Sequence, residues 1–278
     1  MIVAVASGKG GTGKTSVAVN LAISVGNVQL LDCDVEEPNA HLLLNPKIYR
    51  KEPVCNLIPK VDRELCNACG ECTKFCQFNA IFIASDKLLI FPELCHSCGG
   101  CALVCPTKAI TWEKQRIGTL NFGSADDVSL VYGELDVSKP LSVPLIKAVK
   151  NQINKSGNVI LDSPPGTSCP FVETASDSDF CLLVTEPTPF GLHDLKIAVD
   201  VLRRVAVPMG VVVNRAGIGD RKVYDYCEKE GIEILLEIPY ERRIAEFYSK
   251  GVPFSLEMPE WAEKFQILYS KIKEILKE

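Results

Sequence analysis

Residues 1–16, with the sequence MIVAVASGKGGTGKTS, decide the fold. The apolar run over residues 2–6 predicts a strand, and residues 14–25 have helical character. Between them lies a turn that holds four glycines and follows the pattern G-x-x-x-x-G-K-S/T from Gly8 to Thr15. Glycine lets the backbone of such a loop close around phosphate groups and direct its N–H groups at them. The order strand, glycine-rich loop, helix therefore predicts a phosphate-binding loop rather than a glycine-rich turn without a ligand.

Two side chains of this loop carry the chemistry that phosphate binding needs. We expect Lys14 to reach the β- and γ-phosphates of a bound nucleotide, and the hydroxyl of Thr15 to ligate Mg²⁺. The other residues of the loop supply backbone N–H groups. The residues expected to bind nucleotide here are Gly8, Lys9, Gly10, Gly11, Thr12, Gly13, Lys14, Thr15 and Ser16.

Both ends of the chain alternate apolar strands with helical stretches. Val28–Leu31 is the next apolar run after the first helical stretch. After about residue 157, four more short apolar runs follow, at 158–161, 180–185, 210–213 and 233–238. This alternation is typical of a parallel sheet. We therefore expect an α/β fold, a mostly parallel P-loop NTPase sheet with helices on both faces, built from residues 1–60 and 115–278.

The composition limits the class of protein. The 278 residues are 47% hydrophobic and 23% charged, which is the mix of a folded globular chain and excludes disorder. The net charge of −5 argues against a non-specific nucleic-acid coat. No apolar run approaches the roughly 18 residues of a membrane span, and no basic segment precedes the first apolar run as it does in a signal peptide. We expect a cytoplasmic protein that has neither a membrane nor a nucleic acid as its partner.

Cysteine is the exception to this ordinary composition. The chain has 13 cysteines, and eight of them lie between Cys66 and Cys105. Cysteines clustered at fixed short spacing, in a chain without a visible secretion signal, are more typical of metal binding than of disulfides. The same stretch contains an internal repeat with an offset of 29 residues. The residues of its first copy that recur 29 positions later are Cys66, Cys69, Gly70, Cys72, Cys76, Ala80 and Ile81.

Each copy of the repeat has the cysteine spacing C-x2-C-x2-C-x3-C, which is that of bacterial ferredoxins. Three thiolates at this spacing can hold three corners of a 4Fe-4S cluster, and the fourth corner comes from the other copy. One cluster is therefore assigned to Cys66, Cys69, Cys72 and Cys105, and the other to Cys95, Cys98, Cys101 and Cys76. Zinc is the alternative that the C-x2-C pairs alone would allow. We expect residues 61–114 to form a small inserted α+β domain of the bacterial ferredoxin type.

The phosphate-binding loop contains a second lysine, Lys9, in addition to Lys14. In this it resembles the deviant Walker A motif of the MinD/ParA family of P-loop ATPases. The resemblance implies that Lys9 reaches across a dimer interface to the nucleotide of a second protomer, and that the protein is an ATP-dependent homodimer. A solvated loop lysine is the alternative, and the sequence shows no obvious partner for Lys9 within its own chain.

Two further segments resemble the nucleotide-sensing loops of this family. Asp32-Cys33-Asp34 ends a strand, as switch I does, and the resemblance gives Asp34 the role of positioning the attacking water close to Mg²⁺. Asp162 begins the segment Asp-Ser-Pro-Pro-Gly after another strand, as in switch II, and is implied to hold Mg²⁺ through water. Thr15, Asp34 and Asp162 are thus the expected Mg²⁺ residues, and Lys9, Lys14 and Asp34 the expected catalytic residues. A helix N-cap or a turn is the alternative role for each aspartate.

Residues for the base of the nucleotide are expected near the last strands. Asn214, with Arg215, resembles the family's adenine-contacting asparagine. Pro239 lies in a segment that resembles the loop that closes on the base. An ordinary loop role is the alternative for both segments.

With its cysteine-rich insert, the chain is similar to MinD-superfamily ATPases near the nitrogenase iron protein and the Mrp-type iron–sulfur carriers. The resemblance implies an ATP hydrolase whose cofactors are ATP, Mg²⁺ and two 4Fe-4S clusters. The first function we expect is electron transfer, driven by nucleotide, to an unidentified redox partner. Assembly of iron–sulfur clusters, or their delivery to an acceptor protein, is the second. A MinD/ParA-like positioning ATPase with structural clusters is the third.

Overall fold

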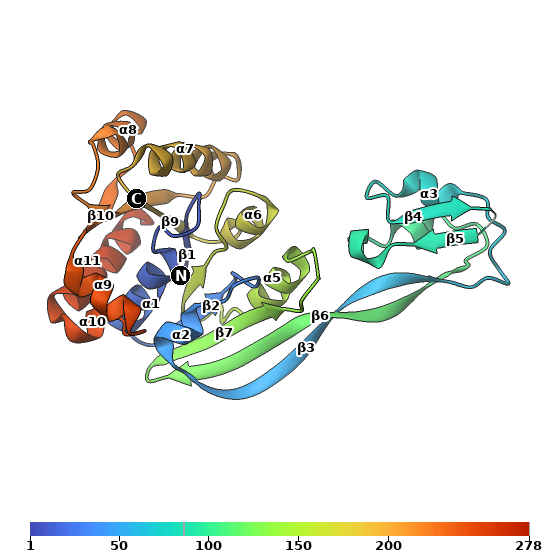
Figure 1. Cartoon of the computed structure of the whole chain (residues 1–278), viewed down its shortest axis with the longest axis horizontal. Helices are drawn as coiled ribbons and strands as arrows, with labels where there is room; N and C mark the ends of the chain where they lie inside the picture. Colours follow the sequence, from blue (N-terminus) through green and yellow to red (C-terminus); the bar gives the residue numbers. More distant parts are fainter. Residues whose placement is uncertain (86, 278) are drawn as a thin grey trace.

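The computed structural model describes residues 1–85 and 87–277. Its main sheet has nine strands in the order β11-β10-β9-β1-β8-β2-β7-β6-β3 (Figure 1). The strands of the main sheet are β1 (Ile2–Ala6), β2 (Val28–Asp32), β3 (Lys47–Val61), β6 (Ile110–Ala125), β7 (Val128–Leu135), β8 (Asn158–Asp162), β9 (Phe180–Thr185), β10 (Met209–Ala216) and β11 (Ile234–Pro239). From β11 to β7 the strands are parallel, whereas β6 is antiparallel to both β7 and β3. The mostly parallel α/β sheet predicted from the sequence is confirmed.

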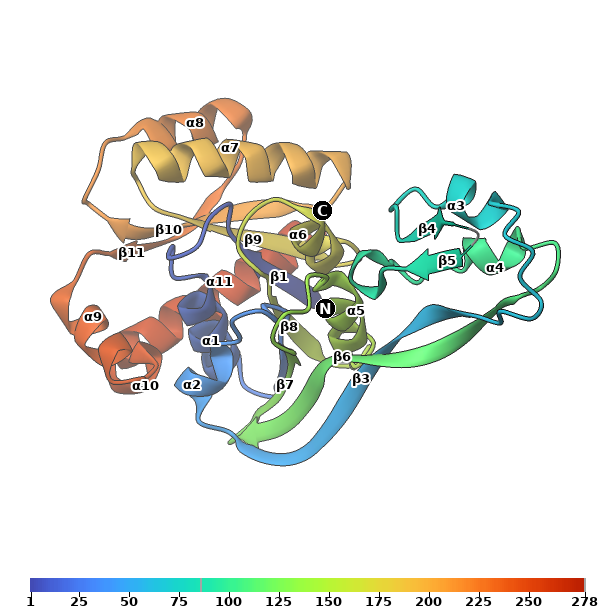
Figure 2. The same ribbon diagram turned by 45° about the vertical axis from the view of Figure 1, so that its right-hand side comes forward.

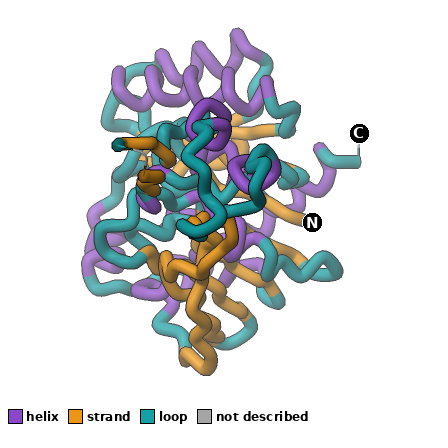
Figure 3. Tube along the Cα trace, turned by 90° about the vertical axis from the view of Figure 1, so that its right-hand side faces the viewer, coloured by secondary structure: helices purple, strands orange, loops and turns teal. Residues whose placement is uncertain are grey.

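Helices lie on both sides of the strands, as the view from the side of the insert shows (Figure 3). They are α1 (Lys14–Val25), α2 (Ala40–Leu44), α5 (Val143–Lys150), α6 (Cys169–Ala175), α7 (Pro189–Arg204), α8 (Lys222–Glu230), α9 (Arg242–Ser249), α10 (Phe254–Glu257) and α11 (Pro259–Ile275). Alternate residues of β1 belong to different cores: Val3 and Val5 pack with α1 and α11, and Ala4 and Ala6 with α5, α6 and α7. Burial on both faces explains why the central strands are continuous apolar runs. Among the helices of the described ranges, none is long and apolar enough to cross a membrane.

The insert stands at the end of a long hairpin. β3 pairs with β6 out to the pair Val61 and Ile110, but only residues 118–125 of β6 also pair with β7. The outer half of the hairpin therefore projects beyond the sheet and carries the cysteine-rich segment away from the other domain (Figures 1 and 2). We expected the insert to span 61–114. In the structure, paired hairpin strands run to Val61 and resume at Ile110.

The two halves of the insert repeat one backbone conformation. Gly70 and Gly99 have φ angles of 82° and 83°, and each directly precedes a short helix, α3 (Glu71–Phe75) or α4 (Gly100–Leu103). Two further residue pairs that are 29 positions apart also have positive φ, Ala68 with Ser97 and Asn79 with Lys108. A two-stranded sheet of β4 (Ile81–Ala84) and β5 (Lys87–Ile90) and a short 3₁₀ helix (Pro92–Leu94) complete this small α+β unit. The sequence repeat is therefore also a repeat of structure.

Candidate functional site

The predicted phosphate-binding loop lies at the carboxyl edge of the sheet, between the end of β1 and the start of α1. Gly13 has a φ of 88°, and a Cβ atom there would come within 2.3 Å of Asn214 Nδ2. At Gly8, a Cβ atom would come within 2.4 Å of the backbone oxygen of Asp194. Both positions need glycine because neighbouring groups approach the backbone too closely for a side chain. These close contacts pack the loop against Asn214 of β10 and Asp194 of α7.

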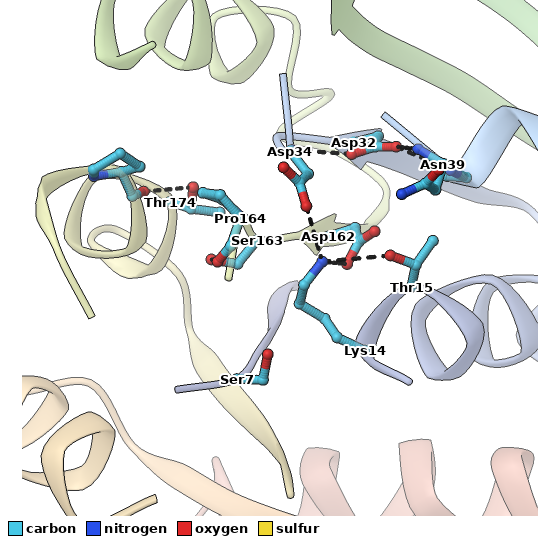
Figure 4. Close-up of polar contacts among 12 residues, drawn as sticks. Ser7, Lys14, Thr15, Asp32, Asp34, Asn39, Asp162, Ser163, Pro164 and Thr174 are labelled. Carbon is cyan, nitrogen blue, oxygen red and sulfur yellow. Dashed lines mark hydrogen bonds and ion pairs between the residues drawn. The ribbon is translucent and has the colours of Figure 1, made fainter. Parts of the chain in front are cut away.

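Lys14 is the centre of a buried charge cluster (Figure 4). Its Nζ lies 2.9 Å from Asp162 Oδ1, 3.6 Å from Asp34 Oδ2 and 3.3 Å from Thr15 Oγ1. Burial opposes the charge on Lys14, but the carboxylates of Asp162, Asp34 and Asp32 outweigh burial and raise the pKa of Lys14. Lys14 therefore stays positively charged within the predicted phosphate-binding loop. The three residues expected to hold Mg²⁺ all lie around this one ammonium group.

Asp32, for which the sequence predicts no role, organises the loop after β2. Its Oδ1 accepts the N–H of Asp34, and its Oδ2 accepts the N–H groups of Asn39 and Ala40, each at 3.0 Å (Figure 4). Burial, together with the charge of Asp162, raises the pKa of Asp32 to about 7. Three backbone donors on one carboxyl group fix the path of this loop and hence the position of Asp34. The only sequence signal for this role is an acidic residue at the end of an apolar strand.

Asp34 lies at the margin of the cluster, and 14% of its side chain is exposed. Burial raises the pKa of Asp34 to about 6, which the charge of Lys14 partly opposes and the charge of Asp162 reinforces. At neutral pH the group is therefore mostly an ionised carboxylate. A carboxylate that reaches both Lys14 and solvent can accept a hydrogen bond from a water next to bound phosphate. The role of Asp34 towards water stays a prediction with which this geometry agrees.

Lys9 has a partner in its own chain, so the expectation that it lacks one is wrong. Its Nζ donates to Glu186 Oε1, and the other carboxylate oxygen of Glu186 lies 3.0 Å from Arg215 Nη1. Glu186 directly follows β9, which pairs with β1, so the end of β9 lies next to the start of the phosphate-binding loop. The sequence separation of 177 residues between Lys9 and Glu186 hides this contact from sequence reasoning.

The residues expected to contact the base come together in one cleft. Asn214, Arg215 and Pro239 line a cleft of about 740 Å³ with residues of the phosphate-binding loop. Asn214 Nδ2 also donates to the backbone oxygen of Thr12 at 2.7 Å, which ties the end of β10 to the loop. Tyr240, which follows Pro239 in the same expected segment, also lines this cleft. Further residues of the cleft, which the sequence does not single out, are Ile218, Ile244, Tyr248 and Phe254. Apolar and aromatic side chains beside a phosphate-binding loop suit the flat face of a nucleotide base.

The eight cysteines of the insert line two separate pockets. One pocket is lined by Cys66, Cys69, Cys72 and Cys105, and the other by Cys76, Cys95, Cys98 and Cys101. Each pocket thus takes three cysteines from one copy of the repeat and one from the other copy. The two groups coincide with the two sets assigned from the spacing.

The thiols of these pockets have unequal surroundings. Burial raises the pKa of Cys72 and Cys95, and raises that of Cys101 to about 11. At Cys105, hydrogen bonds from Thr107 and from backbone N–H groups outweigh burial and lower the pKa. In the part of the chain that the structure describes, no three His, Cys, Asp or Glu side chains converge closely enough to hold a single metal ion.

A mostly parallel sheet with a glycine-rich loop at the carboxyl end of its first core strand defines a P-loop nucleotide-binding protein. Residues 3–254 match the family described as "CobQ/CobB/MinD/ParA nucleotide binding domain", and the chain belongs to this family. The match spans the phosphate-binding loop, the insert and the residues that line the base cleft.

Relatives of the chain include proteins with and without an assigned role. An uncharacterized protein of Methanocaldococcus jannaschii is 32% identical over 261 residues, which are 91% of each chain. The "Iron-sulfur cluster carrier protein" of Pyrococcus horikoshii is 28% identical over 297 residues, with 99% of this chain and 86% of that one covered. Among solved structures, the septum site-determining protein MinD of Pyrococcus horikoshii, complexed with Mg-ADP, has a TM-score of 0.61 at 19% identity, over 99% of this chain and 96% of that one. The last likeness shows the fold alone.

Proposed function

We propose that the protein is a Mg-dependent ATPase that forms a dimer around ATP and couples its nucleotide state to electron transfer through two 4Fe-4S clusters in the insert. The observation that carries this proposal is the division of eight cysteines into two pockets of four. A cluster with four thiolates from one chain has every iron ligated by that chain, which favours a resident redox group over a cargo in transit.

The residues around Lys14 fit a nucleotide with Mg²⁺. Asp162 Oδ2 is buried and has no hydrogen-bond partner among the described residues, so it is free to accept a metal-bound water. Thr15 supplies a hydroxyl beside it, and both are the oxygen donors that Mg²⁺ prefers. When bound, Mg²⁺ neutralises charge that develops on the phosphates. Lys14 binds the phosphates, and Asp34 orients the attacking water.

The two cysteine pockets fit iron–sulfur clusters better than zinc. Zinc needs four donors that meet at about 2.3 Å from one centre. Each pocket instead combines three cysteines of one C-x2-C-x2-C-x3-C run with one from the other copy, which is the set that the separate irons of a cubane need. In each copy the last cysteine of the run accepts a hydrogen bond from the backbone N–H four residues later in the chain. The Ala80 N–H donates to Cys76 Sγ at 3.4 Å, and the Ala109 N–H donates to Cys105 Sγ at 3.3 Å. Such bonds stabilise a thiolate and tune the reduction potential of a cluster that it ligates.

Delivery of clusters to an acceptor protein is the second candidate, because relatives are named iron–sulfur cluster carriers. The two functions differ in how tightly iron is held. We expect the anaerobically purified holoprotein to keep its iron when mixed with an excess of an apo-ferredoxin, and to be reduced and reoxidised reversibly under electron paramagnetic resonance. Transfer of most of the iron to the apo-ferredoxin, faster with Mg-ATP than without it, would instead establish a carrier.

Asp34→Asn tests the hydrolytic site. We expect this variant to bind Mg-ATP like the parent but to hydrolyse it at least about 100-fold more slowly, because the acceptor for the water is lost. In the parent, kcat/KM for ATP hydrolysis should fall as the pH drops through about 6, where the Asp34 carboxylate becomes protonated.

The matched control for this test is Asp136→Asn, which removes a carboxylate that pairs with Arg116 outside the site. This variant should keep the rate and the pH profile of the parent. Parent-like hydrolysis by Asp34→Asn would remove Asp34 from the reaction.

A further inference from the structure

Glu186 joins two cations of the nucleotide site. One of its carboxylate oxygens accepts from Lys9 of the phosphate-binding loop, and the other lies 3.0 Å from Arg215 Nη1 at the end of β10. Only 9% of the Glu186 side chain is exposed, against 29% for Lys9 and 46% for Arg215. The least accessible member of the group is therefore the single acid, which two more accessible cations share.

The backbone holds Glu186 in a fixed position. The Thr188 N–H donates to the Glu186 backbone oxygen at 2.7 Å, and the Thr185 hydroxyl donates to the Gly191 oxygen at 3.0 Å. Gly191 packs so closely that a Cβ atom there would come within 2.2 Å of the Glu186 oxygen. Lys9, in contrast, is a long flexible side chain on a loop. If the contact opens, we expect Lys9 to move, because the main chain of Glu186 is fixed and Arg215 still pairs with its carboxylate.

Opening this contact does not leave a buried charge alone. A carboxylate that loses its only cation in a buried site is strongly destabilised. Glu186 keeps Arg215 when Lys9 departs, so the two cations allow one of them to be released. A Lys9 that must serve another protomer's nucleotide needs this kind of reversible partner.

We propose that Glu186 is a positioning residue that holds Lys9 within its own protomer until a second protomer presents the phosphates of ATP. This inference rests on the ATP-dependent dimer of the proposed function. The triphosphate has more negative charge than one carboxylate that Arg215 already neutralises, so it competes for Lys9. A diphosphate lacks the γ-phosphate and competes less well. Glu186 thereby sets the threshold at which ATP, and not ADP, brings two protomers together.

The test measures dimer formation of the holoprotein by analytical ultracentrifugation during a titration with Mg²⁺ and a non-hydrolysable ATP analogue. We expect Glu186→Gln to reach half-dimerisation at an analogue concentration at least about fivefold below that of the parent. It should also form some dimer with Mg-ADP, whereas the parent should form none. Glu186→Asp keeps the charge and should lie between the two. A gain of dimer that depends on the bound nucleotide is not expected from general misfolding.

Two controls show whether the increased dimerisation is specific to Glu186 and depends on Lys9. Glu230→Gln removes an acid that pairs with Arg203 away from the site, and it should behave like the parent. The double variant Lys9→Ala/Glu186→Gln should stay monomeric, because the gain needs Lys9. The role of Glu186 is overturned if Glu186→Gln half-dimerises at the same analogue concentration as a parent that does dimerise, or if the double variant forms a dimer. Either result leaves the ATP-dependent dimer itself intact. A parent that stays monomeric with the analogue overturns the ATP dimer and this inference with it.

Discussion

We expect the Lys14→Ala protein to bind Mg-ATP at least about a hundredfold more weakly than the parent. The fold places the Lys14 ammonium group inside the cluster of Asp162, Asp34 and Thr15, and only 7% of the Lys14 side chain is exposed. A phosphate group that enters beside these two carboxylates without Lys14 meets uncompensated negative charge. Isothermal titration with Mg²⁺ and an ATP analogue measures the loss directly.

The same substitution also removes the counter-ion of a fully buried aspartate. Asp162 has no exposed surface, and breaking a buried pair costs about 3–5 kcal/mol of folding free energy. The thermal stability of each variant is therefore measured alongside its affinity for the nucleotide. Lys14→Gln, which keeps a hydrogen-bond donor, is the second variant. Lys147→Ala, on the exposed face of α5, is the control. Affinity within about threefold of the parent in a folded Lys14 variant would contradict the assignment of this site.

The second large effect concerns iron. We expect the anaerobically reconstituted parent to hold about eight iron atoms and eight sulfides per chain, because each pocket suits one 4Fe-4S cluster. The pocket grouping makes a sharper prediction for double variants. Cys72→Ser/Cys105→Ser changes two cysteines of one pocket and should keep about four iron atoms. Cys72→Ser/Cys76→Ser changes one cysteine in each pocket and should lose nearly all iron.

The two double variants share Cys72→Ser and differ only in the second cysteine, yet they are expected to keep different amounts of iron. General damage to the insert would not reproduce this difference. Cys55→Ser, at an exposed cysteine of the hairpin outside both pockets, is the control and should keep all the iron. Equal iron in the two double variants would contradict the crossed pairing of the repeats. Stoichiometric zinc in the parent would contradict the clusters themselves.

The parts of the molecule that the sequence predicts are those with local signals. The phosphate-binding loop carries its glycines and lysines within eight residues, and the central strands are apolar because helices cover both faces. The cysteine repeat carries its own spacing, which also predicts how the eight cysteines divide. In each of these cases neighbouring residues determine the structure.

The parts that the sequence does not predict depend on distant contacts or lack a burial pattern. β3 runs for 15 residues with most of its side chains exposed or half-buried, so no apolar alternation marks it as a strand. Glu186 pairs with Lys9 only because β9 lies beside β1 and brings the two residues together. Asp32 fixes the loop after β2 through backbone N–H groups, and that loop has no sequence motif from which this role could be predicted.

The central claim is that the nucleotide state is coupled to the clusters, and an anaerobic redox titration tests it most directly. The midpoint potentials of the reconstituted holoprotein are measured with and without Mg²⁺ and a non-hydrolysable ATP analogue, and again in Lys14→Ala. We predict that the analogue shifts at least one midpoint by about 60 mV, a tenfold change in a one-electron equilibrium, and that Lys14→Ala shows no shift. Midpoints that stay the same in the parent saturated with the analogue would contradict the coupling.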